Sequence, residues 1–119
     1  MRNVTGLGLD LCAISRMQEL LDSGRSLRRM LSEDEEAYVR SKGAGAAQTL
    51  AGLFAAKEAI LKALGTGLSV PMTDIRIVHT ELGQPRALLT GKAEFGGEVQ
   101  LSITHEGDMA AAVALLYIE

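Results

Sequence analysis

Two charged side chains near the middle of the sequence carry the first signal of chemistry. Glu58 and Lys62 lie four residues apart within 46–64, where apolar residues recur at helical spacing, so both side chains share one face of a predicted helix. Ala51 and Ala55 lie on the same face and leave room there for a ligand, a partner or another backbone. The alternative is a surface ion pair, which stabilises a protein by roughly a few tenths of a kcal/mol.

Four further residues have reactive side chains but simpler interpretations. Lys57 falls within the apolar stripe of the same predicted helix, and we expect its side chain to extend along that surface to water. Cys12 is the only cysteine, so an intrachain disulfide is excluded, and we interpret it as a small apolar residue. His105 fits a hydrogen-bonded turn histidine, and His79 is expected to be structural or exposed.

Three predicted helices must position these side chains. The first contains apolar residues at helical spacing from Ile14 onward and stops at Gly24. The second begins with a capping box of Ser32 and Glu35 and runs to about residue 42. The third spans 46–64 and ends at a glycine.

The remaining segments alternate with a period of two, which is typical of strands. Strands are predicted at 4–11, around 75–77 and 87–89, at 99–103, and at 109–118 after a tight turn. Residues 109–118 are rich in Ala and Leu, as in a helix, but their place after a hairpin turn favours a buried strand. We therefore expect an α+β fold, with helices in the N-terminal half packed on an antiparallel β-sheet, in one domain spanning 1–119.

Composition excludes several classes of protein. The formal net charge of −3 argues against a general nucleic-acid binder, and an aromatic content of 3% is too low for a base-stacking platform. The N-terminus has no apolar signal-peptide region, and the longest apolar run, 109–118, is too short to span a bilayer as a helix. These features predict a cytoplasmic protein without membrane association. Because 109–118 is apolar on both faces, we also expect contact between subunits.

Three segments together resemble one family. Residues 6–11 (GLGLDL) resemble the N-terminal G-x-G-x-D strand of bacterial holo-[acyl-carrier-protein] synthases. Residues 54–67 (FAAKEAILKALGTG) resemble the long helix motif and the G-T-G loop of these enzymes. Residues 101–105 (LSITH), followed by alanines at 110–112, resemble their C-terminal motif. The order and spacing of the segments fit over the whole chain.

The resemblance implies a 4′-phosphopantetheinyl transferase. In this family coenzyme A donates its phosphopantetheine arm to a serine of apo-acyl carrier protein, adenosine 3′,5′-bisphosphate is released, and the product supports fatty acid biosynthesis. The family also implies a Mg²⁺ ion and a homotrimer with active sites at subunit interfaces. A non-catalytic trimeric module and a metal-dependent pyrophosphate hydrolase are the competing hypotheses.

The resemblance also implies roles for individual residues. Asp10 and Glu58 match the metal ligands; the alternatives are a general base for Glu58 and an N-cap of the first helix for Asp10. The implied catalytic residues are Glu58, Lys62 and His105. The implied coenzyme A contacts are Lys62, Gly65, Thr66, Gly67 and His105.

The first helix matches the surface on which these enzymes dock their acidic carrier. The predicted docking residues are Arg16, Met17, Leu20 and Arg25. The alternative is an ordinary solvated helix face.

The sequence departs from the family at Leu53 and Gln84, where basic residues are usual. We expect a raised KM for coenzyme A, partly offset by Lys42 or Arg86.

Overall fold

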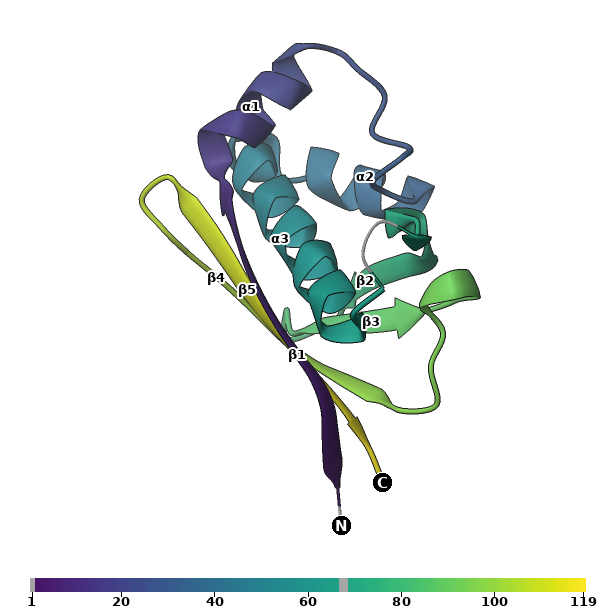
Figure 1. Cartoon of the computed structure of the whole chain (residues 1–119). Coiled ribbons are helices and arrows are strands. Elements are labelled where there is room, and N and C mark those ends of the chain that lie inside the picture. The colour runs from purple at the N-terminus through teal and green to yellow at the C-terminus, as the bar shows by residue number, and fades with distance from the viewer. Residues whose placement is uncertain (1, 67–68) are drawn as a thin grey trace.

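The computed structural model describes residues 2–66 and 69–119 and confirms the α+β class (Figure 1). The chain order of its main elements is β1 (Asn3–Ala13), α1 (Ile14–Asp22), α2 (Glu33–Arg40), α3 (Ala46–Leu64), β2 (Ile75–His79), β3 (Pro85–Leu89), β4 (Glu98–Glu106) and β5 (Met109–Ile118). The predicted helices and strands all form, and 109–118 is a strand.

The strands form two antiparallel sheets, whereas the sequence predicted one. One sheet has the order β1-β5-β4 and the other pairs β2 with β3. The long helix α3 lies across the three-stranded sheet, with α1 and α2 beside it (Figure 1). This helix is therefore the element against which both the N-terminal strand and the C-terminal hairpin are placed.

Strand β1 approaches α3 unusually closely, and two glycines make this possible. A Cβ atom at Gly8 would collide with the carbonyl oxygen of Ala59, and one at Gly6 with that of Ala63. The small side chains on this face of α3 therefore accommodate another backbone, and Ala51 and Ala55 are likewise fully buried.

The helix ends follow the signals in the sequence. The Ser32 side chain accepts a hydrogen bond from the backbone of Glu35, whose carboxylate accepts one from the Ser32 backbone in return, which is a capping box. Helix α3 ends at Leu64, and Gly65 adopts a left-handed conformation with φ of 72°. Both ends of the segment that carries Glu58 and Lys62 thus lie where they were predicted.

The expectation that Lys57 reaches water is wrong. Its side chain is fully buried, and Nζ lies 2.7 Å from Oε1 of Glu35. Nζ also donates to the carbonyl oxygens of Met30 and Met72, and the second oxygen of Glu35 accepts from the backbone of Ile77. Burial lowers the pKa of Lys57, against the opposing effect of the Glu35 carboxylate. The pair joins α3, α2, β2 and two connecting segments.

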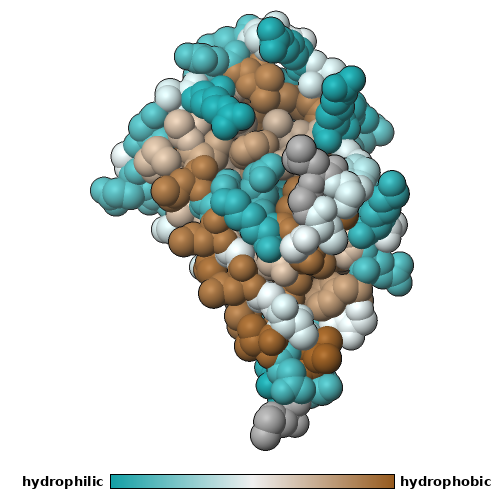
Figure 2. Space-filling view, in the orientation of Figure 1, coloured by the Kyte–Doolittle hydropathy of each residue, from teal (hydrophilic) through white to brown (hydrophobic). Residues whose placement is uncertain are grey.

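The two faces of the three-stranded sheet differ in burial. Ala110, Ala112, Ala114 and Leu116 of β5 are buried. On β1, the side chains of Leu7, Leu9 and Leu11 are 65%, 61% and 62% exposed. Hydrophobic atoms accordingly run down the side of the molecule on which β1 lies (Figure 2). An apolar surface of this kind is typical of a protein interface.

Candidate functional site

An ion pair between β1 and α3 marks the candidate site. Lys62 Nζ lies 3.0 Å from Oδ1 of Asp10 and 3.0 Å from the backbone oxygen of Leu9, to both of which it donates. The Asp10 side chain is mostly buried, while that of Lys62 is 55% exposed. Among the described residues, the ion-pair partner of Lys62 is Asp10, so the predicted alternative of a Glu58–Lys62 surface pair is not formed.

Glu58 lies beside this pair. Its pKa is raised, first by burial and then by the negative charge of Asp10, while Lys62 and Arg16 act in the opposite direction. Glu58 lies one helical turn before Lys62 on α3, so two carboxylates, one from a strand and one from a helix, lie near the same lysine although 48 positions separate them in the sequence. Such an arrangement favours a shared proton or a cation, and it leaves Lys62 exposed enough to meet an anionic ligand.

The alternative that Asp10 caps the first helix is wrong. Asp10 lies within β1, where it pairs with Ala112 of β5, and α1 begins only at Ile14. The cap comes instead from Asp108, whose carboxylate accepts hydrogen bonds from Ser15. The Asp10 carboxylate is therefore not used in helix capping and can contribute to the candidate site.

Three of the four predicted docking residues, Arg16, Leu20 and Arg25, lie at one surface, whereas Met17 is buried in the core beneath it and is not exposed to a partner. Arg16, Met17, Leu20 and Arg25 line a pocket of about 400 Å³ that Phe54 of α3 also borders. The Arg16 guanidinium lies over the Phe54 ring, 5.3 Å from its centroid. Phe54 lies one helical turn before Glu58 on α3, so this surface adjoins Glu58.

His105 lies apart from this group within one chain. Its Nε2 is 3.1 Å from Nε2 of Gln48 in the first turn of α3, and both line a pocket of about 320 Å³ with Leu53 and Pro85. At 1.5 Å per residue, Gln48 and Lys62 are separated by about 21 Å along the helix. The structure therefore brings Asp10, Glu58 and Lys62 together but not His105.

The loop after α3 was also predicted to contact coenzyme A. Gly65 lies at the end of the helix, next to the site, and Thr66 follows it with an exposed side chain and a backbone oxygen that accepts from the hydroxyl of Ser69. Gly67 lies outside the described residues. Gly65 therefore lies about one helical turn from Lys62.

An aromatic pair beside His105 was missed by sequence reasoning. The rings of Tyr38 and His79 stack with centroids 4.3 Å apart, and Nζ of Lys42 lies 4.6 Å from the Tyr38 centroid. Burial, aided by the charge of Lys42, lowers the pKa of His79. The two rings are 41 positions apart, and no local pattern links them. His79 is half-buried and stacks on Tyr38, which agrees with a structural role, one of the two alternatives expected from the sequence (structural or exposed).

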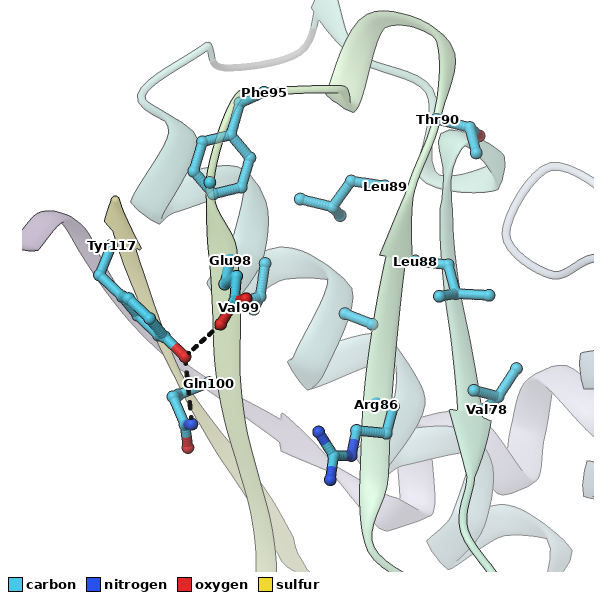
Figure 3. A pocket seen from close by; sticks show the side chains of 12 residues that line it. Val78, Arg86, Leu88, Leu89, Thr90, Phe95, Glu98, Val99, Gln100 and Tyr117 are labelled. Atoms are coloured by element: carbon cyan, nitrogen blue, oxygen red, sulfur yellow. Dashed lines mark hydrogen bonds between the residues drawn. The ribbon is translucent and has the colours of Figure 1, made fainter. Parts of the chain in front are cut away.

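A further pocket, of about 820 Å³, lies between β3 and β4 (Figure 3). Arg86 lies near one end and Phe95 near the other, and the Tyr117 hydroxyl donates to Glu98 at 2.7 Å. Among the candidate residues that the structure describes, Arg86 lines this pocket, whereas Asp10, Glu58 and Lys62 do not. This pocket is therefore separate from the candidate site formed by Asp10, Glu58 and Lys62.

A family model described as the 4′-phosphopantetheinyl transferase superfamily matches residues 6–114. The chain belongs to this superfamily. The match begins at the glycines of β1, includes all of α3 and ends within β5. The resemblance found in the sequence is therefore confirmed, and with it the expectation of a 4′-phosphopantetheinyl transferase.

Individual relatives agree with this assignment to the phosphopantetheinyl transferases. The holo-[acyl-carrier-protein] synthase of Treponema denticola is 41% identical over 120 residues, covering 95% of this chain and 98% of its own. That of Geotalea daltonii is 42% identical over 123 residues, with 95% and 98% coverage. The crystal structure of the Bacillus anthracis synthase, a complex with CoA (3′,5′-ADP), has a TM-score of 0.83 at 32% identity and covers 98% of both chains.

In the part of the chain that the structure describes, no helix combines the length and the apolar character needed to cross a membrane.

Proposed function

We propose that the protein transfers the 4′-phosphopantetheine arm of coenzyme A to a serine of apo-acyl carrier protein and releases adenosine 3′,5′-bisphosphate. The observation that carries this proposal is the convergence of Asp10 and Glu58 beside Lys62, next to a surface with Arg16. Phosphoryl transfer needs negative charge neutralised and a nucleophile held in place, and these groups can do both. The family and its named members support the same reaction.

The donor set of the site suits Mg²⁺. This ion is usually held by one or two carboxylates, and substrate phosphates and water complete its coordination. Asp10 and Glu58 supply two carboxylates, and no group of three or more Asp, Glu, His or Cys side chains that could hold a metal ion by itself occurs among residues 2–66 and 69–119. Burial raises the pKa of Glu58 and the negative charge of Asp10 adds to this effect; a cation would relieve the repulsion between the two carboxylates. When bound, Mg²⁺ would neutralise charge on the pyrophosphate.

The protein side chains then have distinct tasks. The serine oxygen attacks the phosphorus that bears the pantetheine arm, and the bond from that phosphorus to the bridging oxygen breaks. Glu58, the carboxylate on the same helical face as Lys62, receives the serine proton directly or through a water. The hydrogen bond to Asp10 holds the ammonium of Lys62 at the site. There it would lie beside the phosphates of the donor and stabilise the negative charge of the leaving group.

A homotrimer with shared active sites belongs to the same proposal. His105 and Lys62 lie near opposite ends of α3, so a second copy that brings its His105 to the first copy's Lys62 would complete the donor site. The exposed leucines of β1 supply an apolar surface for such contact. Sedimentation should give a trimer at micromolar concentration, and a monomer would reject this part.

The docking partner is an acidic carrier protein of fatty acid biosynthesis, and we place the reaction in the cytoplasm. Arg16 and Arg25 border the pocket beside the carboxylates, where a negatively charged partner would be attracted. The KM for the carrier should therefore rise with salt. A KM that is unchanged from low to high salt would reject docking by charge.

The donor phosphates have fewer basic contacts than the family usually offers. Leu53 is buried, and Gln84 lies exposed in the turn between β2 and β3. Lys42 lies against Tyr38, in the same region as His105, and is the better placed substitute for the 3′-phosphate. Because Lys42 would offset the two missing basic residues only in part, we expect the KM for coenzyme A to be only slightly lower than that for its 3′-dephospho form, and a large preference for coenzyme A would contradict this.

One experiment tests the reaction. Apo-carrier is incubated with the protein, Mg²⁺ and coenzyme A, and the carrier is weighed by mass spectrometry, where the mass of a phosphopantetheine group should be gained. Glu58→Gln should abolish the gain, whereas Glu94→Gln, which removes an exposed carboxylate elsewhere, should not. Hydrolysis of coenzyme A without modification of the carrier would favour a hydrolase. No turnover of either substrate would favour a non-catalytic module.

A further inference from the structure

Helix α1 has no capping side chain of its own. Its N-cap residue is Ala13, which offers no side-chain acceptor, and its first turn contains no acidic residue. Strand β1 runs directly into the helix. The free N–H groups of this end therefore need an acceptor from elsewhere in the chain.

Asp108, in the turn between β4 and β5, supplies that acceptor from 93 positions away. Its Oδ1 accepts from the backbone N–H of Ser15 at 2.9 Å, and its Oδ2 accepts from the Ser15 hydroxyl at 2.7 Å. Its backbone oxygen accepts from the N–H of Ile14 at 2.8 Å. The tip of the hairpin is thus attached to the first turn of α1.

The residue directly after Ser15 is Arg16. Its guanidinium lies over Phe54 and borders the proposed docking pocket, on the side of the two carboxylates. The first turn of α1 decides where this guanidinium lies, and Asp108 holds that turn. A carboxylate beside a docking surface for an acidic partner would itself repel the partner, so the benefit of Asp108 lies in positioning.

We propose that Asp108 is a positioning residue for the carrier: it fixes the start of α1 so that Arg16 faces the incoming partner. This inference rests on the proposed function. It predicts that loss of the side-chain acceptor weakens use of the carrier and leaves use of coenzyme A unchanged.

Two substitutions at the same position separate positioning from charge. Asp108→Ala removes both the charge and the acceptor, and Asp108→Asn removes the charge but keeps an acceptor oxygen for Ser15. We expect the KM for the carrier to rise about fivefold in Asp108→Ala, equivalent to about 1 kcal/mol. Asp108→Asn should stay within about twofold of the unchanged protein. In both, kcat and the KM for coenzyme A should be retained.

Two further variants act as controls. Ser15→Ala removes only the hydroxyl donor and should raise the carrier KM less than Asp108→Ala does. Glu106→Ala removes an exposed negative charge from the same hairpin, two residues away, and should not raise it. The Ile14 hydrogen bond uses the backbone of residue 108, so α1 should persist in every variant, which circular dichroism checks.

The outcomes distinguish this inference from the proposed function. If the unchanged protein fails to modify any carrier, the proposed function fails whatever the variants do. If it modifies the carrier and Asp108→Ala has an unchanged carrier KM, or if Asp108→Asn is as impaired as Asp108→Ala, the positioning role is rejected.

Discussion

Two lysines of α3, five positions apart, each pair with a carboxylate, and the two pairs differ in almost every physical respect. Lys57 is fully buried with Glu35 at 2.7 Å, and its remaining hydrogen bonds go to backbone oxygens. Lys62 is more than half exposed with Asp10 at 3.0 Å, and after its two hydrogen bonds it has one N–H left for another partner. The first pair is closed to ligands, and the second is open.

This difference in burial indicates a structural role for the Lys57–Glu35 pair and a ligand-binding role for the Lys62–Asp10 pair. A buried pair that satisfies its hydrogen bonds specifies how elements meet, and its loss on one side leaves an unpaired charge in the core. An exposed pair adds little stability, and its groups can turn to a substrate at little cost. Variants of the two lysines should therefore separate stability from activity.

The largest effect is expected from Lys57→Met. The Glu35 carboxylate would be left buried without its cation, which costs about 3–5 kcal/mol of the free energy of unfolding. Urea denaturation measures this loss. The double variant Lys57→Met/Glu35→Gln removes both charges and should recover much of the stability. Equal instability of the single and double variants would show that the charge pair is not the cause.

Lys62→Met should give the opposite result. Its free energy of unfolding should change by less than about 1 kcal/mol, because the pair is exposed. Its kcat should fall on the order of 100-fold if the ammonium stabilises the leaving group. Lys92→Met, at another exposed lysine, is the matched control and should keep full activity. A stable, fully active Lys62→Met would remove this residue from the mechanism.

The smallest effect is expected in the stability of Glu58→Gln. The pKa of Glu58 is raised above its ordinary value of 4.5, so the folded protein binds this proton more tightly than the unfolded chain. That contribution to stability is complete below the ordinary value and is lost as pH rises through the raised pKa. Without divalent cations, Glu58→Gln should therefore melt slightly higher than the unchanged protein at pH 7, and no higher at pH 4. A lower Tm at pH 7 would contradict the raised pKa.

Local signals were sufficient for the helices and for most of the site. Ser32 and Glu35 gave the start of α2, and Gly65 gave the end of α3, because capping depends on residues close in sequence. Glu58 and Lys62 were recognised from their spacing, and Asp10 from its motif.

Contacts between distant segments were not accessible in this way. Glu35 completes its capping box and also neutralises Lys57, and only the capping pattern is visible in the sequence. The residues around Asp108 predict a turn, but no local pattern indicates that its side chain caps a helix at the other end of the chain. The division into two sheets likewise depends on how β3 and β4 meet in space.

The bare backbone at Gly6 and Gly8 has a practical consequence for anyone who would rebuild this site in another scaffold. Copying the acidic and basic side chains would not be enough, since any bulk on the inner surface of that strand would push it off the helix and separate the carboxylates. The lack of a Cβ atom at these two glycines is therefore as necessary for the site as its charged side chains.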